Sequence, residues 1–295
     1  MTRCSIAAAA RGDSMVATAP PAHRWLLIEH EGAWPANALE VFDPPVARAL
    51  AARASAMHAR ISLVRRPGRH PREQAPLRWA LADTRPGREG IRWGVVDQHH
   101  DLVDLDWDVT PGEGEPVAIV CAHSRHDVCC ALRGRPVAAA MSHHWPGRVW
   151  ECSHLGGDRF AATMVLLPHA LCYGRVTEQA GARILTAFEA GRLVAEHLRG
   201  RSFFTRREQA AQALARAAGV GGEAIGDLSP RRSLLLGEDV AQVVLGRDEG
   251  DDLVVTLRER TVHLGTPATC RSTVDALAHE YDLVSVTPLE DVARA

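Results

Sequence analysis

The sequence concentrates soft metal ligands in one short stretch, VCAHSRHDVCCALRGRP. Cys121 and Cys130 are separated by eight residues, Cys129 adjoins the second of them, and two histidines lie in between. Thiolate and imidazole groups suit zinc, copper(I) and iron–sulfur clusters. Cys121 lies close to His123 and would also suit an activated nucleophilic thiol. The stretch therefore predicts either a metal site or a reactive cysteine.

A second stretch downstream, VWECSHLGGDRFAATMVLL, supplies Cys152, His154 and Asp158. Gly156 and Gly157 lie within it, and we expect them to bind a cofactor, because a glycine without Cβ lets the backbone wrap closely around a bulky inorganic group. A [2Fe–2S] cluster needs four protein ligands, usually cysteine with histidine allowed. Two ligands from each stretch would satisfy that requirement.

The spacing alone leaves several interpretations of the remaining cysteines and of the cofactor open. An iron–sulfur cluster and a structural zinc ion fit the ligand spacing about equally well, although zinc favours tighter Cys-x₂₋₄-Cys pairs. A redox or nucleophilic thiol is the third interpretation, and it leaves the second stretch unexplained. Consecutive side chains diverge, so Cys129 should point away from Cys130 and pack or stay free. Cys4, Cys172 and Cys270 are isolated in the sequence, and we expect them to be inert packing residues.

Composition and charge exclude several classes of function. Apolar residues make up 46% of the 295-residue chain, which is ordinary for a globular protein of more than one domain. A net charge of −2 gives no reason to expect nucleic acid or an anionic membrane as a partner. No apolar run approaches the roughly 20 residues that cross a bilayer, and no signal-peptide core is evident. An odd number of locally clustered cysteines favours a reduced, cytoplasmic protein.

The hydrophobic pattern predicts an α/β fold (α+β overall) in three parts behind a flexible tail at residues 1–22. Residues 23–112 alternate strand-like and helix-like segments, as in an N-terminal α/β domain. Residues 113–200 have the order β-α-β-α-β-β-α, which is typical of a thioredoxin-like fold. Both ligand stretches begin where a strand ends, and open α/β sheets bind ligands there. Residues 201–295 predict a small C-terminal α+β domain.

The thioredoxin-like part is predicted in more detail. Its expected elements are strands over 116–121 and 148–152, helices over 131–145, 159–164 and 178–200, and a hairpin over 165–176.

The two ligand stretches together resemble the sucrase/ferredoxin-like family. The resemblance is carried by CAHSRHDVCCALRGRP followed by VWECSHLGGDRFAATMVLLPHALCYGRV, and the upstream WLLIEHEGAWP is similar to the N-terminal signature of that family. It extends over most of the chain to about Arg199. The resemblance implies a thioredoxin-like [2Fe–2S] ferredoxin domain behind an N-terminal α/β domain. No residue indicates sucrose hydrolysis, because no persuasive pair of carboxylates is present for it.

The resemblance also implies a ligand set. The family pattern is Cys-x₈-Cys in the first stretch and His-x₃-His in the second, and Cys121, Cys130 and His154 match it. The fourth position departs from the pattern, because Asp158 stands where the family has histidine. Carboxylate is a harder and uncommon iron–sulfur ligand. We therefore favour Cys152 as the fourth ligand, with Asp158 as its rival or as an acceptor for an imidazole N–H.

The sequence thus predicts an electron-transfer protein that carries one [2Fe–2S] cluster with mixed cysteine and histidine ligation. It would pass single electrons between unidentified redox protein partners and would not itself be an enzyme. A thioredoxin-like thiol oxidoreductase, or a zinc-stabilised interaction module built on the same loops, is the alternative.

Overall fold

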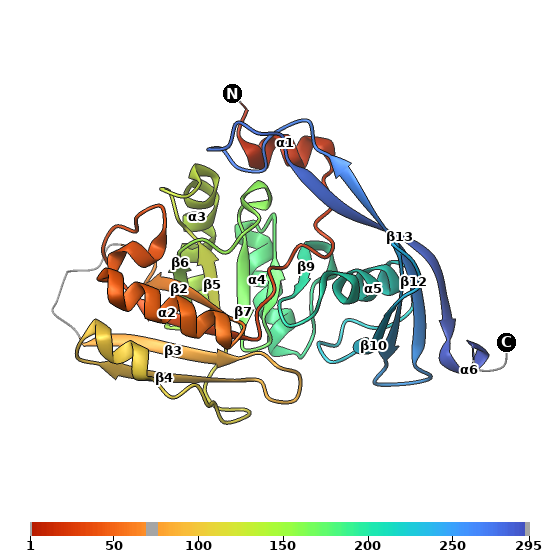
Figure 1. The fold of residues 1–295 in the computed structure, drawn as a ribbon, viewed down its shortest axis with the longest axis horizontal. Coiled ribbons are helices and arrows are strands. Elements are labelled where there is room, and N and C mark those ends of the chain that lie inside the picture. Colours follow the sequence, from red (N-terminus) through yellow and green to blue (C-terminus); the bar gives the residue numbers. More distant parts are fainter. Residues whose placement is uncertain (1, 69–75, 293–295) are drawn as a thin grey trace.

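A computed structural model of the chain describes residues 2–68 and 76–292, which form two β-sheets with helices packed on them (Figure 1). The predicted α/β class is confirmed. The larger sheet has the strand order β4-β3-β1-β2-β6-β5-β7-β8-β9. Its strands are β1 (Arg24–Glu29), β2 (Ala59–Arg65), β3 (Leu77–Asp83), β4 (Gly90–Val96), β5 (Val117–Cys121), β6 (Val149–Cys152), β7 (Met164–Leu167), β8 (Leu171–Tyr173) and β9 (Leu198–Arg201).

The remaining elements are six α-helices, short 3₁₀ helices and a second sheet, counted over the described residues. The helices are α1 (Cys4–Arg11), α2 (Pro44–Ala56), α3 (Val128–His144), α4 (Glu178–Glu189), α5 (Arg206–Ala217) and α6 (Leu289–Val292), with 3₁₀ helices η1 (Ala38–Val41), η2 (His99–Asp104), η3 (Asp158–Phe160) and η4 (Ala195–His197). The second sheet consists of the antiparallel strands β10 (Ser229–Leu235), β11 (Val240–Gly246), β12 (Leu253–His263) and β13 (Leu277–Pro288).

The part predicted as thioredoxin-like has the chain order β5-α3-β6-η3-β7-β8-α4. Strands β5 and β6 are parallel, and β7 and β8 continue the sheet antiparallel. The predicted helix over 159–164 is wrong, because only the turn η3 forms there. From Phe160 onward the carbonyls of Phe160 and Ala162 accept hydrogen bonds from the amides of Arg175 and Val176. These bonds extend the β7–β8 pairing, so the two carbonyls are not available for the hydrogen bonds of a helix.

Helix α4 is also shorter than the helix predicted over 178–200. It ends at Glu189, and Gly191 adopts a φ of +69°. The amide of Arg192 then donates to the carbonyl of Ala187, which is the hydrogen bond that closes a helix at a left-handed glycine. The rest of the predicted helix passes through η4 and forms edge strand β9.

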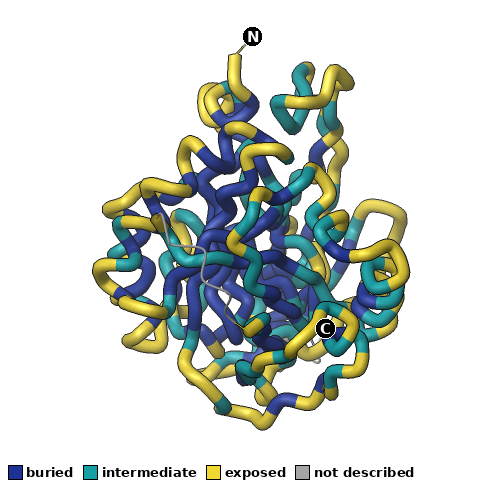
Figure 2. The backbone as a smooth tube through the Cα atoms, turned by 90° about the vertical axis from the view of Figure 1, so that its left-hand side faces the viewer, coloured by how far each residue is buried: buried dark blue, intermediate teal, exposed yellow. Residues whose placement is uncertain are grey.

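The boundary predicted at residue 112 does not separate two sheets. Strand β2 pairs antiparallel with β6, with Val64 opposite Cys152 and Arg65 opposite Glu151. Arg65 and Glu151 also form an ion pair at 2.8 Å. One buried cluster draws its side chains from both halves of the sheet, including Trp25 of β1. The two predicted domains therefore share one sheet and one core, which is the dark interior of Figure 2.

The predicted flexible tail is wrong, because the N-terminal residues form α1 and pack on the rest of the chain. An alanine run has high helix propensity, and one face of the helix buries Cys4 and Ala8 beside η3. Nη2 of Arg175 donates to the carbonyls of Ala8 and Asp13 at 3.2 and 2.7 Å. The segment after α1 then crosses the molecule to reach β1 (Figure 1).

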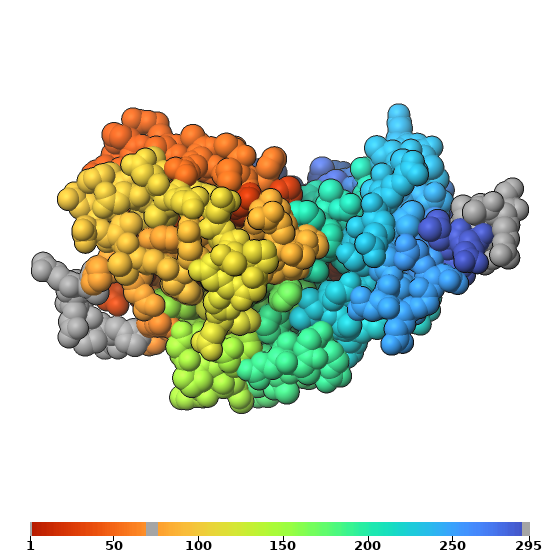
Figure 3. Space-filling model, turned by 90° about the horizontal axis from the view of Figure 1, so that it is seen from below, coloured from red at the N-terminus to blue at the C-terminus, as the bar shows by residue number. Residues whose placement is uncertain are grey.

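The C-terminal residues form the predicted α+β unit, in which α5 packs against the β10–β13 sheet. This unit lies at the end of the molecule opposite the N-terminal half (Figure 3). The long hairpin β12–β13 extends beyond the sheet, and its tip, residues 264–276, reaches α1 (Figure 1). There Arg11 donates to Thr266 Oγ1 at 2.6 Å. Among the described residues, no helix is long and apolar enough to cross a bilayer.

An ion pair between the β3–β4 loop and strand β9 generates a prediction about stability. Glu89, between β3 and β4, accepts a hydrogen bond at 3.0 Å from Arg201 of β9, whose side chain is almost completely buried. Burial opposes ionisation of Glu89, but hydrogen bonding to His169 and the charges of Arg201 and His169 lower the pKa of Glu89 to about 2.

Glu89→Gln should lower the free energy of unfolding at neutral pH by about 2–4 kcal/mol, because it leaves a buried guanidinium without its charge partner. Because the folded-state pKa is depressed, this contribution is fully present above the ordinary value of 4.5 and is lost as the pH falls toward 2. Urea unfolding of both proteins from pH 7 to pH 3 measures it. A gap between the two proteins that stays constant over this range would contradict the assignment.

Candidate metal centre

The two ligand stretches meet because they follow neighbouring parallel strands. Cys121 ends β5, Cys152 ends β6, and the two residues are partners in the parallel register. Alternation along β5 turns Ile119 and Cys121 toward the core shared with β6, while Ala118 and Val120 face α3 and α4. The loops after both strands therefore begin at one edge of the sheet.

The first turn of α3 points its two cysteines in opposite directions. Asp127 caps the helix, with Oδ1 accepting a hydrogen bond from the Cys129 amide at 2.8 Å. Cys130 lies in the core cluster with Cys121, whereas Cys129 lies in a separate cluster. Gly134 brings the helix against β5, because a Cβ there would lie 1.9 Å from the carbonyl oxygen of Cys121. Glycine at this position is therefore required by the close packing of the helix on the strand.

Four side chains form a closed ring of contacts at this edge of the sheet. Cys130 Sγ donates to Asp158 Oδ1 at 3.1 Å, and His154 Nδ1 lies 3.1 Å from the same oxygen. Cys121 lies next to Cys130 and His154, close enough for each to shift its ionisation. The structure thus brings together the three matched residues of the family pattern and the aspartate at its fourth position.

These contacts shift the ionisation of the ring toward a thiolate, a carboxylate and an imidazolium, and the imidazolium must lose its proton before it can bind a metal. Hydrogen bonding from Cys130, helped by His154, holds the pKa of the Cys121 thiol well below its usual range despite complete burial. Burial opposes the charged forms of His154 and Asp158. Their mutual hydrogen bond and charges nevertheless raise the pKa of His154 to about 9 and lower the pKa of Asp158 below its usual range.

The ring fits a metal cofactor in its donor chemistry. It offers two sulfurs, one imidazole and one carboxylate, and thiolate and imidazole are established iron–sulfur ligands. Nδ1 of His154 is buried and lies 3.1 Å from Asp158 Oδ1, and the neutral imidazole would offer a metal the lone pair that faces this oxygen. The His154 side chain is 28% exposed, which leaves the site accessible at one corner.

The contacts favour Asp158 over Cys152 as the fourth ligand, which reverses the preference drawn from the sequence. Cys152 is fully buried beside Cys121 on the same face of the sheet. Within residues 2–68 and 76–292, it makes no hydrogen bond to His154 or Asp158, whereas Asp158 contacts both Cys130 and His154. Asp158 reaches the ring because Gly157 starts the turn η3, which buries the carboxylate.

His126 is a member of the site that the sequence reasoning did not identify. Its ring stacks on His154 with centroids 3.5 Å apart, and its Nε2 lies 3.6 Å from Asp158 Oδ2. Donor atoms of His126, His154 and Asp158 all lie within 4.8 Å of one another. The available signal was its position in the first loop, four residues before Cys130.

His123 orients the second loop and does not activate Cys121. Its Nε2 lies 2.7 Å from the carbonyl oxygen of Pro35, and its Nδ1 accepts a hydrogen bond from the His154 amide at 3.3 Å. Both ring nitrogens are therefore engaged by backbone groups. A nucleophilic thiol also needs access to its substrate, and the side chains of Cys121 and Cys130 are completely buried.

The two glycines of the second loop permit the turn and leave space for a buried arginine. Gly156 and Gly157 have φ values of +90° and +81°, which L side chains rarely adopt. A Cβ on Gly157 would lie 2.5 Å from the guanidinium of Arg199. Arg199 Nη1 donates to the Gly156 carbonyl at 2.9 Å, and its Nε donates to Thr18 Oγ1 at 3.1 Å. These contacts explain the presence of glycine at both positions without any cofactor wrapped by the loop.

Cys4 and Cys270, expected to be inert packing residues, do pack, but in one cluster with Cys129, whose sulfur both of them contact. Cys172 does pack in the core, where its Sγ lies 3.2 Å from Ser202 Oγ. No sequence pattern indicated the contacts among Cys4, Cys129 and Cys270, because more than a hundred residues separate each from the next.

Comparison with known proteins gives one family assignment. Searches of curated proteins and of solved structures returned no match. A family model described as sucrase/ferredoxin-like matches residues 15–200, which include both loops and the complete ring of contacts. The match covers more than half of the chain, and the resemblance seen in the sequence is confirmed: the chain belongs to the sucrase/ferredoxin-like family.

Proposed function

We propose that the chain is an electron-transfer protein that carries one [2Fe–2S] cluster, held by Cys121, Cys130, His154 and Asp158. The observation that supports the proposal is the closed ring of contacts among these four side chains. They occupy the positions of the family's Cys-x₈-Cys and His-x₃-His pattern, with aspartate in place of the second histidine. When bound, the cluster supplies one-electron chemistry.

The surrounding protein favours an additional negative charge at the ring. Arg199 is 3% exposed, and it holds the glycine loop that carries Asp158 through backbone contacts. Burial lowers the pKa of Arg199, while the nearby negative charge of Asp158 acts in the opposite direction. A fixed cation next to the ligands stabilises an added electron, because it reduces the electrostatic cost of the reduced state.

The ring is accessible from the side on which three histidines lie. His123, His126 and His154 line one end of a surface groove whose walls come from η1, α2 and β2. The cysteines lie behind them, fully buried. An electron carrier needs only close approach of a partner, whereas thiol–disulfide exchange needs an exposed sulfur. The geometry therefore favours electron transfer over the alternative of a thiol oxidoreductase.

The direct test is the cofactor content of the purified wild-type chain. After anaerobic purification or reconstitution with iron and sulfide, we expect about two irons and two sulfides per chain, with visible charge-transfer absorption that bleaches on reduction. Metal analysis for iron and zinc accompanies the spectrum. A colourless protein that takes up neither iron nor sulfide would contradict the proposal.

The fourth ligand is tested by a matched pair of variants. Asp158→Ala should reduce iron retention about 10-fold or more, because it removes a ligand from the ring. Cys152→Ser should retain nearly normal iron content and absorption, because the isosteric hydroxyl keeps the packing beside Cys121. The reverse outcome assigns the position to Cys152. Iron loss in His126→Ala with retention in Asp158→Ala assigns it to His126.

Asp158→His restores the family's second histidine and provides a gain-of-property test. The cluster should be retained, and its midpoint potential should rise by on the order of 100 mV, because a neutral imidazole replaces an anionic ligand. Protein-film voltammetry or a dye-mediated titration measures the shift. An unchanged or lowered potential in a variant with normal iron content would contradict ligation by residue 158.

A further inference from the structure

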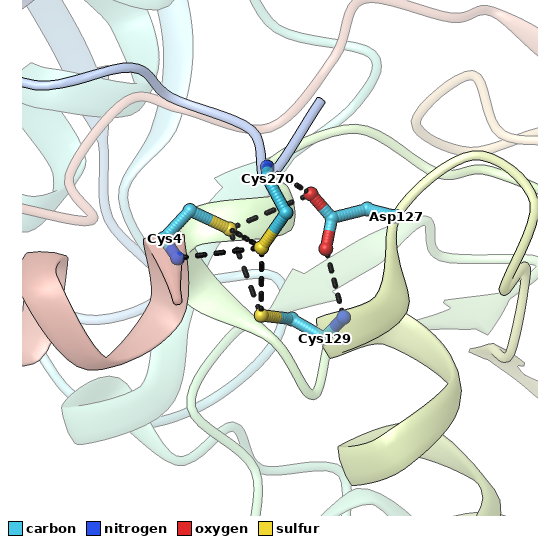
Figure 4. A group of neighbouring side chains, drawn as sticks. All are labelled: Cys4, Asp127, Cys129 and Cys270. Carbon is cyan, nitrogen blue, oxygen red and sulfur yellow. Dashed lines mark hydrogen bonds between the residues drawn. The ribbon is translucent and has the colours of Figure 1, made fainter. Parts of the chain in front are cut away.

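A second cluster of metal-ligating side chains lies beside the first, on the other side of the start of α3. It consists of Cys4, Asp127, Cys129 and Cys270, whose donor atoms all lie within 4.8 Å of one another (Figure 4). Cys4 begins α1, Cys129 lies in the first turn of α3, and Cys270 lies at the tip of the β12–β13 hairpin. Three distant segments of the chain therefore converge on one point.

The three sulfurs form a nearly equilateral triangle. The Sγ atoms of Cys4 and Cys129 are 3.7 Å apart, those of Cys4 and Cys270 are 3.5 Å apart, and those of Cys129 and Cys270 are 3.4 Å apart. Asp127 Oδ2 lies 3.5 Å from Cys4 Sγ. The cluster is shielded, because Asp127 and Cys129 are buried, Cys4 is nearly so, and only Cys270 is half-buried.

These separations match a single tetrahedral ion. With Zn–S bonds of about 2.3 Å and Zn–O bonds of about 2.0 Å, tetrahedral geometry places two sulfurs about 3.8 Å apart and a sulfur and an oxygen about 3.5 Å apart. An iron–sulfur cluster would hold ligands of different irons farther apart. A disulfide requires sulfurs at about 2.05 Å, and it would leave the third cysteine and the aspartate without a role.

Backbone amides are arranged to support negative charge at the cluster. The amide of Cys4 points to Cys270 Sγ at 3.4 Å, and the amide of Cys270 donates to Asp127 Oδ2 at 2.6 Å. The other oxygen of Asp127 accepts from the Cys129 amide at the start of α3. The N-termini of two helices thus face the site, and their exposed amides offset the charge of thiolate ligands.

We propose that Cys4, Cys129, Cys270 and Asp127 bind one structural zinc ion that joins α1, α3 and the β12–β13 hairpin. Four protein donors with no open position are typical of a structural zinc site. Cys4 and Cys270 both lie outside the residues matched by the family model, so the site is not part of the family pattern. It is separate from the ring of Cys121 and its partners and does not depend on the cofactor bound there.

Adjacent cysteines of α3 provide a matched test in the full-length chain. Wild-type protein, Cys129→Ser and Cys130→Ser are purified under reducing conditions with added Zn²⁺, and zinc is measured by mass spectrometry of the elements. Wild type and Cys130→Ser should each retain about one zinc per chain at this site. Cys129→Ser should lose at least about 10-fold in zinc affinity. Cys270→Ser, at the half-buried hairpin tip, should lose zinc in the same way if Cys129→Ser does not fold.

Co²⁺ supplies a spectroscopic readout of the ligands themselves. Titrated into the wild-type chain and Cys130→Ser, it should produce the intense visible bands of tetrahedral cobalt with thiolate charge transfer, and Cys129→Ser should lose them. Zinc retained in both Cys129→Ser and Cys270→Ser would overturn the proposal. So would a reduced wild-type chain that binds neither Zn²⁺ nor Co²⁺, or an intact mass showing a disulfide between two of the three cysteines in protein isolated with thiols blocked.

Discussion

The carboxylate of Asp127 fixes the start of α3, and the geometry of both ligand clusters depends on it. One oxygen caps the helix at the Cys129 amide, and the other accepts the amide of Cys270 from the distant hairpin. With the first turn fixed in this way, two adjacent cysteines enter different environments. Loss of the cap would let the turn fray and would disturb both sets of contacts at once.

Close packing behind that turn makes the arrangement rigid. Gly134 holds α3 against β5 at Cys121, one of the proposed ligands, and any larger side chain would push the helix away from it. The opposite face of β5 and β6 is buried in a core shared with the N-terminal strands. Ligand positions are therefore set by the large sheet, and short loops only have to connect them. For the electron transfer proposed above, such preorganised positions would mean that little of the protein needs to move between oxidation states.

Local sequence patterns were sufficient to predict the elements that carry the ring of Cys121, Cys130, His154 and Asp158. The apolar runs ending at Cys121 and Cys152 predicted two buried strands, and the spacing of the ligands predicted that their loops would meet. The preference for Cys152 at the fourth position rested on ligand hardness alone, without the knowledge that the turn at Gly157 buries Asp158 against Cys130. The six residues read as a helix after this turn were too few for periodicity to distinguish a helix from an extended segment.

Contacts between the ends of the chain had no local signal. Cys4 and Cys270 are single cysteines in unremarkable surroundings, and only the folded chain brings them to Cys129. The same limit applies to the shared sheet, since the pairing of β2 with β6 joins residues almost ninety positions apart and no short-range pattern encodes it.

The contact of the hairpin tip with α1 also sets an order of events during synthesis. A ribosome that has made Cys4 and Cys129 must still add almost half of the chain before Cys270 is made. Until then the first turn of α3 presents its outward cysteine to solvent, and the N-terminal helix lacks one of its neighbours. The hairpin covers the Cys129 thiol last, so the nascent chain carries an accessible thiol that the finished protein no longer exposes.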